Sequence, residues 1–139
     1  MPDSFSADVA ARILSTGGNA VDAAVAGALV LAVTYPEAGN VGGGGFMLTC
    51  VDGTAQFLDY RETAPAAATR DMYLDARGEV IEGLSLTGHR AVGVPGTVAG
   101  LWEAHRRYGR LPWRDVVEPA VQLAQRGFQV PPLLAERAT

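Results

Sequence analysis

The hydrophobic positions first recur with a helical period. Ala10, Ile13 and Leu14 fall on one face of a predicted helix that Ser6 or Asp8 can cap and that runs to about Ser15. Ser and Asp favour a helix start because their side chains accept hydrogen bonds from the first free backbone N–H groups. The pattern therefore predicts an amphipathic helix at the beginning of the chain.

A second helix is predicted from Asn19 to about Thr34, after the helix stop Gly17-Gly18. Asn19 can cap it, and Asp22 lies in its first turn, where the helix dipole favours a carboxylate. The helix has almost no polar face and ends before Pro36. A helix that is apolar all round is expected to be buried between layers.

A β-hairpin is predicted next. Phe46–Val51 and Thr54–Tyr60 have the composition of strands, and Asp52-Gly53 between them is typical of a tight turn. The first strand is continuously apolar, which predicts burial on both faces. Cys50 lies inside this strand and is therefore interpreted as a buried, inert thiol rather than a nucleophile.

Four consecutive glycines, Gly42–Gly45, stand directly before the first strand. Because glycine loses more backbone entropy on folding than other residues, such a run is expected where the chain needs a positive φ or where a backbone or ligand comes very close. A phosphate-binding loop is not indicated, because no Lys or Ser/Thr follows the glycines and the order is helix, glycines, strand. We expect a tight turn in which Gly43 does not tolerate a side chain.

The next segment is a long excursion followed by a helix. Residues 63–85 contain proline, glycines and charges, and they predict a loop with at most one helical turn. A third helix is expected from Thr97 to about Arg107. Glu103 and Arg107 are four residues apart and are predicted to pair on its outer face.

A fourth helix is expected between Trp113 and Arg126, and its start has two interpretations. In one, Asp115 caps the helix, which places Pro119 in the first turn. In the other, the helix starts at Pro112 and kinks at Pro119.

Composition places the chain among globular domains. It has 139 residues, 48% of them hydrophobic, and a net charge of −4 with scattered acidic groups, so neither disorder nor nucleic-acid binding is indicated. One cysteine excludes an internal disulfide. No signal peptide is visible, and the longest apolar stretch, residues 23–35, is too short for a membrane segment.

The pattern also predicts that the chain is a fragment. A two-stranded hairpin is marginally stable alone, so the sheet is expected to gain strands from elsewhere. Residues 133–139 have the pattern of a helix opening with nothing after it.

The residues contain no complete catalytic set. His89 and His105 have no second ligand at a metal-binding spacing, and both are interpreted as structural histidines. No serine lies in a G-x-S-x-G turn. Neither catalytic residues nor metal ligands are therefore predicted in this chain.

Arg61 is the candidate binding residue. It lies where the second strand ends, and strand ends beside loops commonly hold ligand-binding groups. A guanidinium binds a carboxylate through two parallel hydrogen bonds. The alternative is an exposed arginine paired with Asp59 or Glu62, and the residues alone favour that alternative.

Four distinct multi-residue motifs follow one another along the chain. They are Gly17-Gly18-Asn19-Ala20-Val21-Asp22-Ala23-Ala24-Val25-Ala26, Pro36-Glu37-Ala38-Gly39-Asn40-Val41-Gly42-Gly43-Gly44-Gly45-Phe46-Met47, Asp59-Tyr60-Arg61-Glu62-Thr63-Ala64-Pro65 and Pro95-Gly96-Thr97-Val98-Ala99-Gly100. In this order they resemble the opening of the gamma-glutamyltranspeptidases, and the match covers nearly the whole chain.

The resemblance implies an N-terminal nucleophile hydrolase, an α+β fold built as a four-layer αββα sandwich. Residues 1–139 are then an incomplete N-terminal portion of the large subunit, mostly helical with a β-hairpin. The family precursor cuts itself into a large and a small subunit, and the new N-terminal threonine of the small subunit is the nucleophile. The enzymes remove the γ-glutamyl group from glutathione and related amides and pass it to water or to an amine.

For this chain the resemblance implies that Arg61 binds the α-carboxylate of the γ-glutamyl substrate, which reverses the interpretation from the residues alone. It implies the small subunit of the same precursor as a partner, no cofactor, and no catalytic residue within residues 1–139. The polypeptide alone is therefore expected to be inactive. Family members are periplasmic, secreted or surface-anchored, so export of the parent protein is expected.

Two alternatives stay open. The parent protein could be a related amidohydrolase, such as a cephalosporin acylase or a poly-γ-glutamate capsule enzyme. It could also be a noncatalytic relative that uses the same fold for binding. A threonine followed by a short strand several hundred residues downstream would favour an enzyme.

Overall fold

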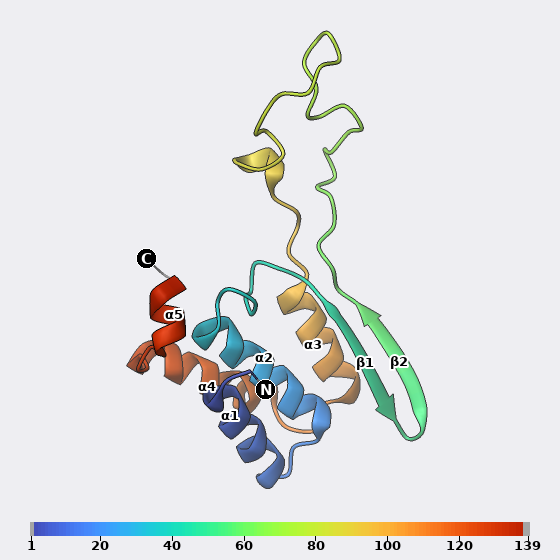
Figure 1. The fold of residues 1–139 in the computed structure, drawn as a ribbon. Helices are drawn as coiled ribbons and strands as arrows, with labels where there is room; N and C mark the ends of the chain where they lie inside the picture. Colours follow the sequence, from blue (N-terminus) through green and yellow to red (C-terminus); the bar gives the residue numbers. More distant parts are fainter. Residues whose placement is uncertain (1, 138–139) are drawn as a thin grey trace.

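The computed structural model describes residues 2–137 of the chain. Its helices lie on one side of a β-hairpin, and a long loop extends away from both (Figure 1). The elements of the described chain are α1 (Ser4–Ser15), α2 (Ala20–Thr34), β1 (Phe46–Val51), β2 (Thr54–Asp59), η1 (His89–Ala91), α3 (Thr97–Tyr108), α4 (Trp113–Arg126) and α5 (Pro132–Arg137).

The cap of α1 is Asp3, so the prediction of Ser6 or Asp8 is wrong. The Asp3 carboxylate accepts a hydrogen bond from the Ser6 backbone N–H at 2.7 Å. It also accepts one from the Thr34 hydroxyl at the end of α2, a partner far away in sequence. Burial opposes ionisation of Asp3, but the hydrogen bonds from Thr34 and Ser6 outweigh it, and the pKa of Asp3 is lowered.

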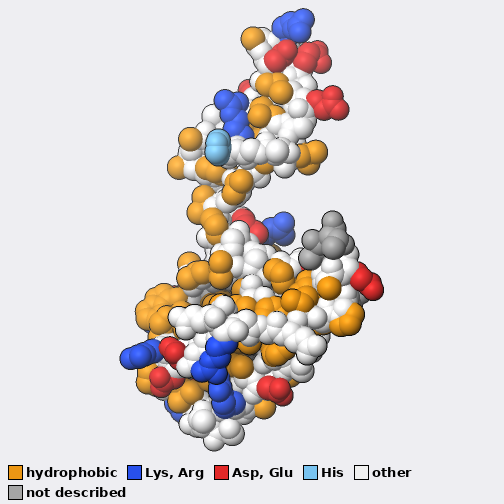
Figure 2. Space-filling view, turned by 90° about the vertical axis from the view of Figure 1, so that its left-hand side faces the viewer, with side chains coloured by type: hydrophobic (Ala, Val, Ile, Leu, Met, Phe, Trp, Pro, Cys, Tyr) orange, Lys and Arg blue, Asp and Glu red, His pale blue; other side chains and the backbone are white. Residues whose placement is uncertain are grey.

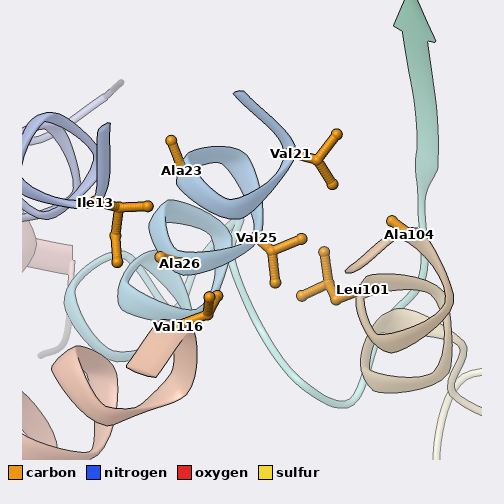
Figure 3. Close-up of a cluster of buried hydrophobic side chains, with 8 residues drawn as sticks. All are labelled: Ile13, Val21, Ala23, Val25, Ala26, Leu101, Ala104 and Val116. Carbon is orange, nitrogen blue, oxygen red and sulfur yellow. The ribbon is translucent and has the colours of Figure 1, made fainter. Parts of the chain in front are cut away.

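The helix α2 is the central element and packs against α1, α3 and α4. Its predicted start is confirmed by a capping box, in which the Asn19 side chain accepts from the N–H groups of Val21 and Asp22 and Asp22 accepts from the Asn19 N–H. Ile13 of α1 is buried against it, whereas Leu14 is half exposed. Figure 3 shows the main cluster of buried hydrophobic side chains, which consists of Ile13, Val21, Ala23, Val25, Ala26, Leu101, Ala104 and Val116.

The predicted hairpin is confirmed. Its two strands pair antiparallel from Phe46↔Asp59 to Val51↔Thr54. Asp52 and Gly53 have φ angles of 50° and 77°, and positive φ at both central residues is typical of a type I′ turn.

Only one face of the hairpin is covered by the described residues. Met47 and Leu58 pack against the helices, whereas Leu48 is 77% exposed and Phe57 63% exposed. The prediction of two buried faces is therefore wrong, and so is that of a buried Cys50, which is exposed on the same side as Leu48. The apolar outer face is suited to a second packing layer that residues 2–137 do not supply.

The helix α3 lies between α2 and the hairpin (Figure 1). The predicted pair on its surface is confirmed, since the Glu103 carboxylate lies 2.6 Å from Arg107, and Arg106 joins it at 2.7 Å. Pro112 is the cap of α4 and Pro119 lies inside it, so the start of the helix at Pro112 is confirmed, while the kink at Pro119 stays a prediction.

The helix α5 falls in the segment where a helix opening was predicted. Residues 138–139 of that prediction lie outside the described residues. None of the described helices combines the length and apolar character that crossing a bilayer requires.

Residues 63–94, called the arm below, project from the body as the predicted excursion (Figure 1). The base of the arm is closed by an antiparallel bridge between Thr63 and Val94, and a second bridge joins Leu74 to Val80 near its tip. As predicted, residues 63–85 contain turns and no more than one helical turn, and the short η1 follows them in the arm. Hydrophobic side chains follow its length, and charges of both signs gather at its tip (Figure 2).

Candidate functional site

Arg61 lies two residues beyond β2, at the junction between the hairpin and the arm. Its backbone N–H donates a hydrogen bond to the Asp59 carboxylate at 3.0 Å. The residue is exposed, and within residues 2–137 its guanidinium forms no ion pair with Asp59 or Glu62. The pairing that the residues alone favoured is therefore not formed, and the cation faces solvent from a strand end.

The backbone that carries Arg61 is fixed first by the glycine run. The hairpin ladder continues one pair beyond β1, because the Tyr60 N–H donates to the Gly45 carbonyl at 3.0 Å and the Gly45 N–H to the Tyr60 carbonyl at 3.4 Å. The residue immediately before Arg61 is thus part of the sheet.

Gly44 lies against the backbone on both sides of Arg61. A Cβ at Gly44 would stand 2.6 Å from the Glu62 nitrogen, 2.7 Å from the Tyr60 carbonyl oxygen and 2.8 Å from the Arg61 Cα. All three are backbone atoms, which cannot move aside as a flexible side chain can. Any residue other than glycine at this position must therefore displace the segment that carries Arg61.

The start of α3 closes the other side of the same segment. The N–H groups of Gly96 and Thr97 donate to the Gly43 carbonyl at 2.8 and 3.0 Å, which ties the glycine run to the helix. A Cβ at Gly96 would lie 1.9 Å from the Tyr60 carbonyl oxygen. One turn later, a Cβ at Gly100 would lie 2.1 Å from the Tyr60 Cγ.

We call Gly44, Gly96 and Gly100 the glycine clamp, since Gly44 and Gly96 lie against the Tyr60–Arg61 backbone and Gly100 lies against the Tyr60 side chain. The Tyr60 ring lies over Gly100 and also over Gly45, where a Cβ would be 3.0 Å from the ring. Burial in this slot raises the pKa of the Tyr60 phenol.

Close approach, and not a positive φ, accounts for the glycines at positions 43, 44 and 45, whereas a Cβ at Gly42 would meet only the Asn40 side-chain oxygen, at 3.8 Å. None of Gly42–Gly45 has a positive φ, so that part of the expectation is wrong. The tightest backbone contact is at Gly44 rather than at Gly43, whose Cβ would meet the end of the Asn40 side chain at 2.7 Å. Sequence reasoning missed the partner glycines, although Gly96 and Gly100 are four residues apart and so lie on one face of α3.

The histidines lie apart from the candidate site. His105 is buried as predicted, with its Nε2 2.9 Å from the Leu111 carbonyl oxygen and its ring against Trp113. His89 is exposed on the arm. In the described part of the chain, no group of three or more His, Cys, Asp or Glu side chains could hold a metal ion.

These contacts define what the site can do. The Arg61 guanidinium has no anionic partner in the described residues, and the backbone that carries it is packed between the glycine run and the start of α3. Such a group can bind a carboxylate through two charge-assisted hydrogen bonds with a defined orientation.

Comparison with known proteins places this arrangement in a family. The gamma-glutamyltranspeptidase family model matches residues 6–139. The glutathione hydrolase proenzyme of Pseudomonas aeruginosa is 66% identical over 129 residues, which cover 93% of this chain and 23% of that protein. The chain thus spans less than a quarter of this curated relative.

Solved structures support the same assignment. The gamma-glutamyltranspeptidase from Pseudomonas nitroreducens complexed with L-DON matches with a TM-score of 0.92 and 62% identity, over 99% of this chain and 41% of that chain. A cephalosporin acylase from Bacillus halodurans matches with a TM-score of 0.80 but 30% identity, over 95% of this chain and 24% of that chain. The predicted α+β class, with helices and a β-hairpin from the N-terminal nucleophile hydrolase fold, is confirmed. The chain belongs to the gamma-glutamyltranspeptidase family.

Proposed function

We propose that this chain is the N-terminal portion of the large subunit of a γ-glutamyl transferase and hydrolase, and that Arg61 binds the α-carboxylate of its donor substrate. The observation that carries the proposal is the exposed guanidinium of Arg61, which has no ion-pair partner among residues 2–137 and is mounted on a clamped backbone.

The chemistry of the donor fits this role. A γ-glutamyl amide such as glutathione keeps a free α-carboxylate at the end opposite to the bond that breaks. Two parallel hydrogen bonds from the Arg61 guanidinium would fix both the position and the rotation of that carboxylate. The γ-carbonyl would then be presented in one orientation to the attacking group.

The reaction itself requires the small subunit of the same precursor. In the proposed reaction, a threonine hydroxyl on that subunit attacks the γ-carbonyl carbon, and its proton passes by way of a base to the departing amine. Water or an acceptor amine then attacks the γ-glutamyl ester, which releases the threonine. Within this scheme Arg61 binds the donor and takes no part in bond making.

The relatives favour this activity over the alternatives. Sequence identity is 66% to the glutathione hydrolase proenzyme of Pseudomonas aeruginosa and 62% to the gamma-glutamyltranspeptidase of Pseudomonas nitroreducens, against 30% to the cephalosporin acylase. An accessible Arg61 is expected both of an enzyme and of a noncatalytic binding relative, so the preference for an enzyme comes from these relatives.

Kinetics of the full-length protein test the proposal. The protein should mature into two subunits and release glutamate from a γ-glutamyl anilide. Arg61→Ala should raise KM at least about 100-fold and Arg61→Lys at least about tenfold, because each lost charged hydrogen bond is worth about 1.5–3 kcal/mol. Arg70→Ala, which removes a 96% exposed arginine of the arm, is the matched control and should leave KM unchanged.

A modified donor identifies the group that Arg61 binds. When the α-carboxylate of the anilide is replaced by a neutral amide, the wild-type KM should rise to that of Arg61→Ala, and the variant should show no further increase. An absence of turnover in the mature wild type, or equal KM values for the two Arg61 variants and the wild type, would contradict the proposal.

A further inference from the structure

We propose that Gly44 and Tyr60 are positioning residues, which set the location of Arg61 and so determine how well the donor carboxylate is bound. This inference rests on the proposed function of Arg61. It goes beyond it because neither residue needs to touch the substrate.

Gly44 constrains the Arg61 backbone from one side. The three atoms that a Cβ would meet, within 2.6–2.8 Å, belong to consecutive residues centred on Arg61. Ordinary van der Waals contact begins at about 3.4 Å, so an added methyl group must open this contact by several tenths of an ångström. The glycine run cannot easily move away from Arg61 instead, because backbone hydrogen bonds join Gly43 to the start of α3 and Gly45 to Tyr60.

Tyr60 constrains the same backbone from the other side. Its ring fills the slot over Gly100, and its carbonyl lies so close to Gly96 that no side chain fits between them. The Tyr60 ring therefore packs the end of β2 on α3, and α3 in turn packs on α2. Arg61 is thus attached to a rigid part of the fold, although its own side chain is exposed.

A displaced guanidinium keeps its charge but no longer has the position that two parallel hydrogen bonds to the carboxylate require. The two bonds to a carboxylate require coplanar groups at hydrogen-bond distance, so a shift of the backbone weakens both bonds at once. Misplacement of a binding group by about 1 Å can cost about 100-fold in the step that depends on it. A smaller shift at Gly44 should accordingly cost about tenfold.

The glycine run itself offers a matched pair of variants for the test. Gly44→Ala adds a methyl group against the Arg61 backbone, whereas a Cβ at Gly42 meets only the Asn40 side-chain oxygen, at 3.8 Å. In the mature full-length enzyme Gly44→Ala should raise the donor KM about tenfold, with kcat per titrated active site unchanged within about twofold. Gly42→Ala should leave both constants unchanged.

A double-mutant cycle separates positioning from general damage. If Gly44 acts through Arg61, then Gly44→Ala should add nothing to KM in an Arg61→Ala background, although it raises KM about tenfold in the wild type. Equal KM increases in both backgrounds would overturn the inference while leaving Arg61 as the carboxylate ligand. A normal KM for Arg61→Ala would instead contradict the proposed function.

A second pair of variants keeps the inference testable if Gly44→Ala does not fold. Tyr60→Ala empties the slot over Gly100 and should raise KM about tenfold, again only when Arg61 is present. Tyr60→Phe keeps the ring and should retain the wild-type KM. If Tyr60→Ala reduces the yield of mature enzyme but leaves KM unchanged, Tyr60 is a packing residue and the inference fails.

Discussion

At the scale of single residues, Asp22 joins two distant parts of the chain. Its carboxylate has no exposed surface and accepts hydrogen bonds from the backbone N–H groups of Asn19, Arg110 and Leu111 at 2.9–3.3 Å. The Nε2 of His105 lies 3.5 Å away. The residue that completes the cap of α2 therefore also fixes the loop between α3 and α4.

Asp22→Asn should destabilise the full-length protein by about 3 kcal/mol. The substitution keeps the shape but turns an amide NH₂ group toward backbone N–H donors, which leaves buried donors without acceptors. The urea midpoint of unfolding measures the effect. Asp8→Asn, the same change at an exposed position of α1, should alter the free energy of unfolding by less than about 0.5 kcal/mol. Similar midpoints for the two variants would contradict this role of Asp22.

The same residues mark how far the sequence can predict contacts. The cap formed by Asn19 and Asp22 was predictable because its partners lie within three residues. The bonds from Asp22 to Arg110 and Leu111 cross 88 and 89 positions, and no local pattern encodes such a distance. For the same reason the sequence indicated a close approach at the glycine run without identifying Tyr60 and Arg61 as its partners.

At the scale of elements, α3 carries on its exposed side a carboxylate that is paired with two arginines. Glu103 accepts hydrogen bonds from Arg106 at 2.7 and 2.8 Å and from Arg107 at 2.6 Å. The hydrogen bonds from Arg106, which have the larger effect, and those from Arg107 lower the pKa of Glu103 from 4.5 to about 2. The helix that supplies two glycines of the clamp is thus supported by ionised Glu103.

The lowered pKa predicts the direction of a pH effect. A carboxyl group with a lower pKa in the folded state contributes stability that is present above its unfolded pKa of about 4.5 and is lost as the pH falls toward about 2. Urea midpoints of wild type and Glu103→Gln should therefore differ at neutral pH and converge as the pH falls below 4.5. Glu82→Gln, at an exposed position of the arm, controls for the removal of one negative charge. A difference that grows on acidification would contradict the account.

The hairpin turn depends on its glycine. Gly53 has a φ of 77°, so Gly53→Ala should destabilise the hairpin by about 1–2 kcal/mol, the cost of a left-handed conformation with a Cβ. Asp52→Asn should be neutral or mildly stabilising, because Asn tolerates positive φ. Hydrogen exchange of the β1 and β2 amides in the two variants measures the difference, and equal protection would argue against a type I′ turn.

The two strands were predictable from Asp52-Gly53 and the flanking apolar runs, whereas the burial of their faces was not. The periodicity of a strand identifies which side chains share a face, but the presence of a covering layer depends on the rest of the fold. The outward-facing Leu48 and Cys50 therefore departed from the prediction although the strand itself was correct.

At the scale of the whole molecule, the large apolar side chains that are most exposed among the described residues lie on the outer hairpin face and on the arm. The outer hairpin face carries Phe46 stacked on Phe57 at 5.8 Å together with Leu48, and the arm exposes Val80 and Leu86 among others. Exposed apolar patches of this kind mark surfaces that bind other protein surfaces. A polypeptide consisting of residues 1–139 alone should therefore associate with itself.

Sedimentation of that isolated polypeptide tests the expectation. It should behave as a species larger than the 14.5 kDa monomer, and Leu48→Lys should shift it toward the monomer by placing a charge on the apolar face. Gln56→Lys adds the same charge to the neighbouring strand, at a residue paired with Thr49 on the opposite face, and should have little effect. If the wild-type polypeptide is a monomer, the outer face of the hairpin is not an association surface.

The most direct test of the central claim is a crystal structure of the mature full-length protein with glutamate bound. Two of the three guanidinium nitrogens of Arg61 are expected to donate one hydrogen bond each to the two oxygens of the α-carboxylate, with the Tyr60 ring still lying over Gly100. A bound glutamate whose α-carboxylate is held by other groups, with the Arg61 side chain directed into solvent, would contradict it.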